Sequence, residues 1–143
     1  MPGQSFQHST TTSLEPSRVW ASLDEPHTWE AIPGVDRVID AAVDPDGRLR
    51  GFSFESDVGG RKYLGKATPG GREEGRLMAW DIDSSEVKGK VSIELGPNAD
   101  GTRVQVRLDV EGVGMLGSLF FPVIASAIGS GFAATVEEFV AGL

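Results

Sequence analysis

The sequence predicts an α+β domain in which one antiparallel sheet of seven strands packs against helices. Most of the chain alternates apolar and polar residues, as half-buried strands do. Two short stretches near the N-terminus have helical spacing instead, and the last segment is a long uncharged run. The 143 residues are expected to form a single domain, residues 1–143.

The first strand is predicted from the residues that share one parity near the N-terminus. Phe6, His8, Thr10, Thr12 and Leu14 alternate with polar neighbours. β-Branched and aromatic residues are enriched in strands, which favours this assignment. His8 shares its parity with Phe6 and Leu14, so we expect it near the inward face, as a hydrogen-bonded strand residue close to the open end.

Two short helices are predicted after this strand. Pro16 suits a first helical turn, and Val19, Trp20 and Leu23 follow at helical spacing. A second helical stretch over 27–31 directs Trp29 and Ile32 inward and is expected to end at Pro33-Gly34.

From Val35 the apolar period changes to two. Strands are predicted over 35–43, 48–57, 61–68, 75–84, 86–95 and 102–110, with turns at 44–47, 59–60, 69–71 and 97–101. Asp44-Pro45-Asp46-Gly47 has the residue preferences of a type I turn. The glycines at 51, 65, 75 and 89 are expected to help bend the sheet and to leave volume in its interior.

The C-terminal segment is predicted to form one long helix. No charged residue occurs from Met115 to Val136, so length alone also permits a membrane span. The predicted helix has one face of bulky residues and another of smaller, more polar residues, and no Lys or Arg flanks the segment. Both observations favour a helix packed on the sheet over a membrane span. We expect Pro122 to kink this helix or to delay its start. The bulky face consists of Phe120, Ile124, Ile128, Phe132, Val136 and Phe139.

The order of these elements and several short motifs resemble the SRPBCC superfamily, which includes START-type lipid-transfer domains, birch-pollen-allergen-like proteins and the polyketide cyclase/dehydrase family. The resemblance covers nearly the whole chain. It rests on the stretch from Leu14 to Trp20, the stretch from Leu23 to Val35, and Gly101-Thr102-Arg103-Val104 before the apolar helix. Ile32-Pro33-Gly34-Val35 and the run from Gly112 to Gly117 are also similar to a family of accessory subunits of carbon monoxide dehydrogenase.

This resemblance implies a helix-grip fold, in which a curved sheet grips the C-terminal helix around an apolar cavity. It further implies the binding of a hydrophobic small molecule such as a lipid, a polyketide or an isoprenoid. The inward residues either fill the space or leave a pocket, and the residue pattern does not decide between these. The residues expected to line a cavity are His8, Thr10, Trp29, Ile32, Phe52, Phe54, Tyr63, Met78, Trp80, Ile93, Val106, Phe120, Ile124 and Ile128.

Composition excludes several function classes. A formal net charge of −8 disfavours nucleic acid as a partner. The chain has no cysteine, and its two histidines have no metal-ligand spacing, so we expect no metal and no cofactor. The N-terminal stretch lacks the pattern of a secretory signal, and we expect a cytoplasmic monomer or weak homodimer.

Two other functions remain open at this point. One is a polyketide cyclase or dehydratase, for which His8 and Tyr63 are the candidate acid–base groups, although no motif identifies a catalytic residue. The other is an accessory protein whose C-terminal helix docks on a membrane or on a partner enzyme.

Overall fold

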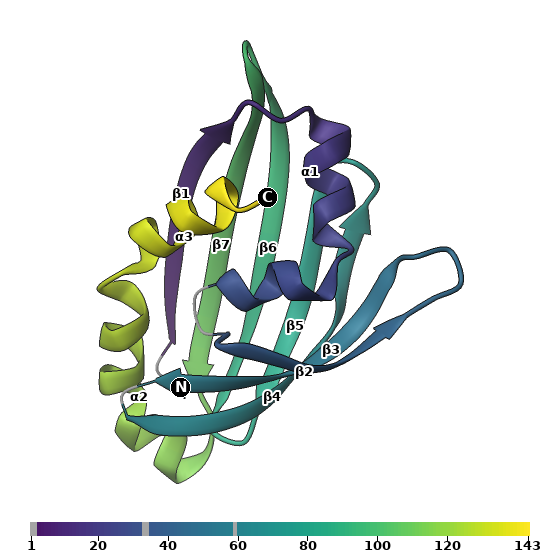
Figure 1. The fold of residues 1–143 in the computed structure, drawn as a ribbon. Coiled ribbons are helices and arrows are strands. Elements are labelled where there is room, and N and C mark those ends of the chain that lie inside the picture. The colour runs from purple at the N-terminus through teal and green to yellow at the C-terminus, as the bar shows by residue number, and fades with distance from the viewer. Residues whose placement is uncertain (1–2, 33–34, 59) are drawn as a thin grey trace.

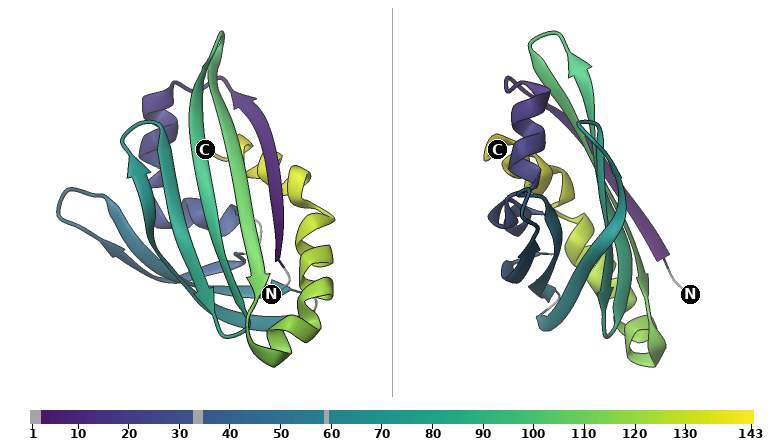
Figure 2. Two further views of the ribbon diagram at one scale, coloured as in Figure 1. Left: turned by 180° about the vertical axis from the view of Figure 1, so that it is seen from behind. Right: turned by 90° about the vertical axis from the view of Figure 1, so that its right-hand side faces the viewer.

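A seven-stranded antiparallel sheet with helices on its concave side forms the body of the protein (Figures 1 and 2). The computed structural model describes residues 3–32, 35–58 and 60–143, so the expected ends at Pro33-Gly34 and Gly59 lie outside the described residues. The strand order is β1-β7-β6-β5-β4-β3-β2. The predicted fold class is therefore confirmed.

The strands follow the predicted alternation. Their bounds are β1 Gly3–Thr12, β2 Arg37–Val43, β3 Leu49–Val58, β4 Arg61–Glu73, β5 Leu77–Ser84, β6 Val87–Asn98 and β7 Gly101–Gly112. In β7 the alternation is strict: Val104, Val106 and Leu108 are buried, whereas Arg103 and Arg107 are exposed. Such a strand covers the core with one face and meets water with the other.

Strand β4 is longer than the sequence predicts. Pro69-Gly70-Gly71 was expected to turn the chain, but it lies within β4, and the turn follows at Gly75, whose φ is +75°. Proline is tolerated here because the pairing of β3 with β4 ends at Phe52 and Ala67, so no β3 carbonyl requires a donor from residue 69. The register between β4 and β5 shifts between Pro69 and Gly71, which indicates a bulge that bends the sheet.

Helices from the N-terminal part of the chain and helices from its C-terminal part together cover the concave face of the sheet. Helix α1 spans Pro16–Leu23, and the 3₁₀ helix η1 spans Pro26–Ala31. The C-terminal helical segment consists of α2 Gly114–Gly129 and α3 Phe132–Ala141, which are bent by 50° at the break. Pro122 lies inside α2, which begins well before it, so the proline does not delay the helix start.

The break between α2 and α3 is also relevant to the alternative that the C-terminal segment spans a membrane. Within the described part of the chain, no single helix is long and apolar enough to cross a membrane. Only α2 and α3 taken together reach that length and composition, and they are bent relative to each other.

Helix α1 is fixed to the sheet by a small polar network beside the core. The Arg72 guanidinium donates to both carboxylate oxygens of Asp24, at 2.9 and 3.1 Å. It also lies over the Trp20 ring, with Arg72 Cζ at 5.1 Å from the ring centroid. The Trp20 indole in turn donates to Glu74 at 3.0 Å. The network therefore joins α1 to the end of β4.

Replacement of Arg72 tests how much this network stabilises the fold. Arg72→Leu is expected to lower the free energy of unfolding by about 2 kcal/mol, because Asp24 loses its charged partner in a partly buried position. Arg107→Leu is the control, since Arg107 pairs with Asp109 on the exposed face of the sheet. Denaturant unfolding of both variants measures the difference, and equal losses would contradict a special role of the network.

Candidate functional site

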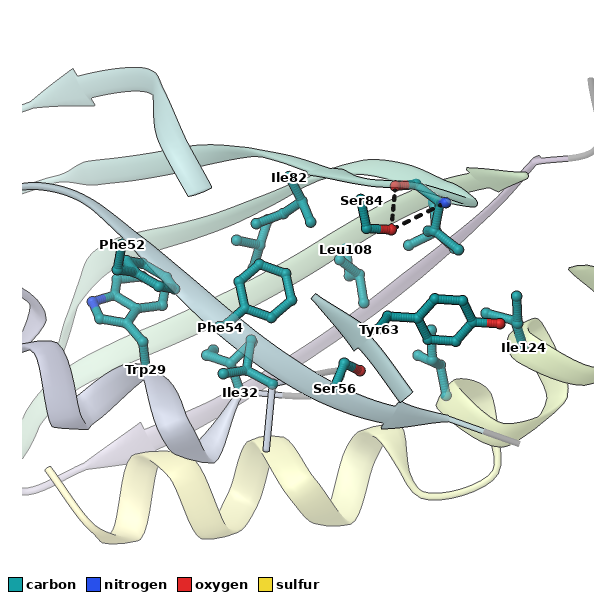
Figure 3. A pocket seen from close by; sticks show the side chains of 15 residues that line it. Trp29, Ile32, Phe52, Phe54, Ser56, Tyr63, Ile82, Ser84, Leu108 and Ile124 are labelled. Atoms are coloured by element: carbon teal, nitrogen blue, oxygen red, sulfur yellow. Dashed lines mark hydrogen bonds between the residues drawn. The ribbon is translucent and has the colours of Figure 1, made fainter. Parts of the chain in front are cut away.

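A small apolar pocket lies between the concave face of the sheet and α2. It extends from Trp29 at one end to Tyr63 and Ile124 at the other (Figure 3). Its free volume is about 60 Å³, well below the roughly 300–1,000 Å³ of pockets that hold drug-sized ligands. The lining residues are Trp29, Ile32, Val35, Phe52, Phe54, Ser56, Tyr63, Ile82, Ser84, Val87, Val91, Leu108, Val110, Ile124 and Ile128.

Strand β3 supplies the long wall of the pocket. Its alternation places Phe52, Phe54 and Ser56 on the inward face. The Phe54 ring occupies the space that a side chain at Gly65 of β4 would take, since a Cβ there would lie 2.5 Å from Phe54 Cζ. Gly65 was expected to leave interior volume, and the structure shows that an aromatic ring fills it.

The Trp29 indole closes one end of the pocket. The side chain is fully buried, and its Nε1 donates to the Leu23 carbonyl oxygen at 2.8 Å. Its ring packs against Phe52, Trp80 and Phe139 at centroid distances of 6.0, 5.9 and 6.2 Å. Trp80 and Phe139 belong to the buried core and do not line the pocket, so the Trp29 ring lies between the pocket and this part of the core.

The edge of the pocket at the β5–β6 turn is held by Ser84. Its hydroxyl donates to the Val87 carbonyl oxygen at 2.9 Å and accepts from the Val87 N–H at 3.2 Å. Both hydrogen bonds are formed within the turn, so this hydroxyl already has its hydrogen-bond partners in the protein.

An acidic groove adjoins the pocket on the side of η1. It has a free volume of about 320 Å³ and shares Ile32, Val35 and Ile128 with the pocket lining. Four carboxylates line it, from Glu30, Asp36, Asp57 and Glu138. The Val38 N–H donates to Glu30 at 3.0 Å, and this hydrogen bond lowers the pKa of Glu30 and favours its charged form.

Helix α2 presents its apolar side chains to solvent as well as to the pocket. Met115 is 88% exposed and Leu119 is 67% exposed, and Leu116 and Val123 are also exposed. Ile124, on the opposite side of the helix, is buried against Tyr63. One helix therefore forms both a wall of the pocket and an apolar patch on the surface.

Comparison with known proteins identifies the family. The family model described as "Polyketide cyclase / dehydrase and lipid transport" matches residues 3–143. The chain belongs to this family. A search of the curated proteins found none that matches the sequence.

Solved structures with the fold of this polyketide cyclase and lipid transport family resemble the protein along its whole length. A START superfamily protein from Mycobacterium smegmatis is 13% identical with a TM-score of 0.67, covering 98% of this chain and 94% of its own. The Mll3558 protein from Rhizobium loti is 17% identical with a TM-score of 0.65, covering 99% and 98%. Ara h 8.0201 is 14% identical with a TM-score of 0.59, covering 99% and 100%. At these identities the likeness establishes the fold.

The structure divides the expected cavity residues of this family member into two groups. Those that it places around the pocket are Trp29, Ile32, Phe52, Phe54, Tyr63, Ile124 and Ile128. Met78, Trp80, Ile93 and Val106 instead lie in the packed core, because α1, η1 and α3 cover that half of the sheet. Phe120 packs at the edge, against Tyr63 and Ile124. Ligand binding by the lining residues stays a prediction.

His8 and Thr10 do not line the pocket, contrary to expectation. They face α3 from the edge strand β1: His8 Nε2 lies 2.8 Å from Glu137 Oε1, and the Thr10 hydroxyl donates to Glu137 Oε2 at 2.8 Å. The expectation of a hydrogen-bonded strand residue at His8 agrees with this contact. Tyr63 is therefore the ionisable residue among the described residues that line the pocket.

Several lining residues were missed. They are Val35, Ser56, Ile82, Ser84, Val87, Val91, Leu108 and Val110. Strand parity carried the signal for some of them, since Ser56 shares the parity of Phe52 and Phe54. Val91 and Leu108 likewise share the parity of Ile93 and Val106 on their own strands, which were expected to line the cavity. Among the residues that the structure describes, no cluster of three His, Asp or Glu side chains is arranged to hold a metal ion.

The contact of Glu137 with β1 predicts a pH dependence of stability. Hydrogen bonds from His8 and Thr10 lower the pKa of Glu137 in the folded protein. Its stabilising contribution is therefore present above the unfolded pKa of about 4.3 and is lost as the pH falls through the folded pKa. Glu137→Ala should lower the melting temperature at about pH 7, and the difference from wild type should shrink toward about pH 3.

Glu138→Ala on the same helix serves as the control for this measurement. Glu138 is exposed and forms no side-chain hydrogen bond with another residue of the described chain. A loss of stability in Glu137→Ala that is independent of pH would contradict the assignment.

Proposed function

We propose that this protein binds a hydrophobic small molecule in the pocket between the sheet and α2. The observation that carries the proposal is the lining itself, which is aliphatic and aromatic apart from Ser56, Ser84 and the Tyr63 hydroxyl. Pockets of this composition bind ligands mainly by apolar burial. Burial of about 200 Å² of apolar ligand surface contributes about 5 kcal/mol before the costs of association.

The ligand enters by widening the pocket, because about 60 Å³ does not accommodate a lipid, polyketide or isoprenoid. Helix α2 is the element that moves. It begins at Gly114, whose φ is +74°, and ends at the 50° bend to α3, so the direction of the chain changes at both of its ends. Its displacement separates Ile124 and Ile128 from Phe54 and Tyr63 across the pocket.

Uptake of the neutral fluorophore N-phenyl-1-naphthylamine tests the proposal. We expect saturable fluorescence enhancement with the wild-type protein. Ile128→Trp fills the pocket and should weaken uptake about tenfold or more. Leu119→Trp on the exposed side of the same helix is the matched control and should leave uptake unchanged. Absence of saturable uptake, or equal binding by both variants, would refute ligand binding at this site.

The exposed side of α2 supports a second function, docking to a lipid surface. Met115, Leu116, Leu119 and Val123 form an uncharged apolar patch, and no charged residue lies on α2 at all. Burial of these exposed apolar side chains in the headgroup region of a bilayer would favour such docking. Docking there would place the pocket wall at the source of a hydrophobic ligand.

Flotation with phosphatidylcholine vesicles measures this docking directly. The wild-type protein should float with the vesicles, whereas Leu119→Asp should stay in the aqueous fraction, because it places a charge in the contact face. Val43→Asp is the control, since Val43 is an exposed apolar residue on β2. Equal flotation of the two variants, or none of the wild type, would exclude this role of α2.

A further inference from the structure

The polar groups of the pocket differ in whether they already form hydrogen bonds within the protein. The Trp29 indole N–H is bonded to the Leu23 carbonyl oxygen, and the Ser84 hydroxyl bonds only within its own turn. The Tyr63 phenol points toward Ile124 of α2, at the end of the pocket (Figure 3). The first two groups are therefore unavailable to a ligand, and the Tyr63 hydroxyl lies at the margin of the pocket.

Ser56 is the exception in the middle of the pocket. Its side chain is 5% exposed and lies between the Phe54 ring and Tyr63 (Figure 3). Strand β3 directs it to the same face as Phe52 and Phe54, into the lining. Its hydroxyl forms no side-chain hydrogen bond with another residue of the described chain. A hydroxyl that lines an apolar pocket and has no partner in the protein can form a hydrogen bond with a ligand oxygen.

The charges around the pocket restrict that ligand further. Among the described lining residues none is Asp, Glu, Lys, Arg or His. A charged ligand group would therefore be buried without a counter-ion, which is strongly unfavourable. The adjoining groove carries the carboxylates of Glu30, Asp36, Asp57 and Glu138, which disfavour an anion beside the pocket.

We propose that the ligand is a neutral lipophile with one hydrogen-bonding oxygen, and that Ser56 binds this oxygen while the apolar body lies between Trp29 and α2. This inference rests on the proposed binding function and names its ligand class: alcohols, ketones or esters, not carboxylates or ammonium ions. Ser56 is a specificity residue of the pocket.

Competition against bound N-phenyl-1-naphthylamine separates the ligand classes. The competitors are 1-decanol, methyl decanoate, sodium decanoate and decylamine, which share one alkyl chain length or nearly so. We expect the two neutral compounds to displace the fluorophore at concentrations about tenfold or more below those of the two charged compounds. Displacement by decanoate or decylamine at the concentrations that suffice for decanol would overturn the proposal.

Two serine variants test the anchor itself. Ser56→Ala should weaken decanol binding about three- to tenfold, with the affinity for the fluorophore measured separately for each variant. Ser84→Ala is the matched control, because its hydroxyl lines the same pocket but is bonded to Val87, and decanol binding should stay as in wild type. An unchanged decanol affinity in Ser56→Ala would overturn the role of Ser56.

Thermal unfolding of Ser56→Ala gives a second readout that needs no ligand. Removal of a hydroxyl without a partner should leave the melting temperature unchanged or raise it. A marked decrease would show that the protein itself uses the hydroxyl and would contradict the proposal. Failure of fluorophore uptake by the wild-type protein, in contrast, would refute the binding function and not only the ligand class.

Discussion

The Trp29 indole joins parts of the chain that are far apart in sequence. Its N–H is bonded to the end of α1 at Leu23, and its ring packs against Phe52 of β3, Trp80 of β5 and Phe139 of α3. The N–H of a buried tryptophan usually has a hydrogen-bond partner, and the Leu23 carbonyl oxygen is the partner of Trp29. Both helical layers, from the N-terminal and C-terminal parts of the chain, are therefore held against the sheet at this residue.

The same cluster divides the interior into two regions. On one side, α1 and α3 cover Met78, Ile93 and Val106, and the packing is continuous. On the other side α2 and the end of η1 face the sheet, and the pocket with Ser56 and Tyr63 lies there. Trp29 lines the pocket and also belongs to the buried core, so it lies at the border between the two regions.

Much of this architecture could be predicted from the sequence, because period-two alternation determines which side chains meet the core. Phe52 and Phe54 were identified in this way, and Ser56 shares their parity but was missed because it is polar. His8 also has the inward parity, yet it meets Glu137, since a strand pattern does not reveal which helix covers an edge strand. The bend between α2 and α3 falls at Ser130-Gly131, where apolar helical spacing continues in the sequence, although the glycines at 129 and 131 are a local signal for a helix break.

The central claim is that a hydrophobic ligand occupies the region between Trp29 and α2, and the isoleucines of this chain test it most directly. Ile32, Ile82, Ile124 and Ile128 line the pocket, whereas Ile93 lies in the packed core and Ile39 on the surface. Methyl NMR spectra of isoleucine-labelled protein, recorded during titration with 1-decanol, report on all of these positions at once. The account predicts intermolecular NOEs from the ligand to the pocket methyl groups and none to Ile93 or Ile39. Contacts confined to surface methyl groups, or none at any position up to the solubility of decanol, would contradict it.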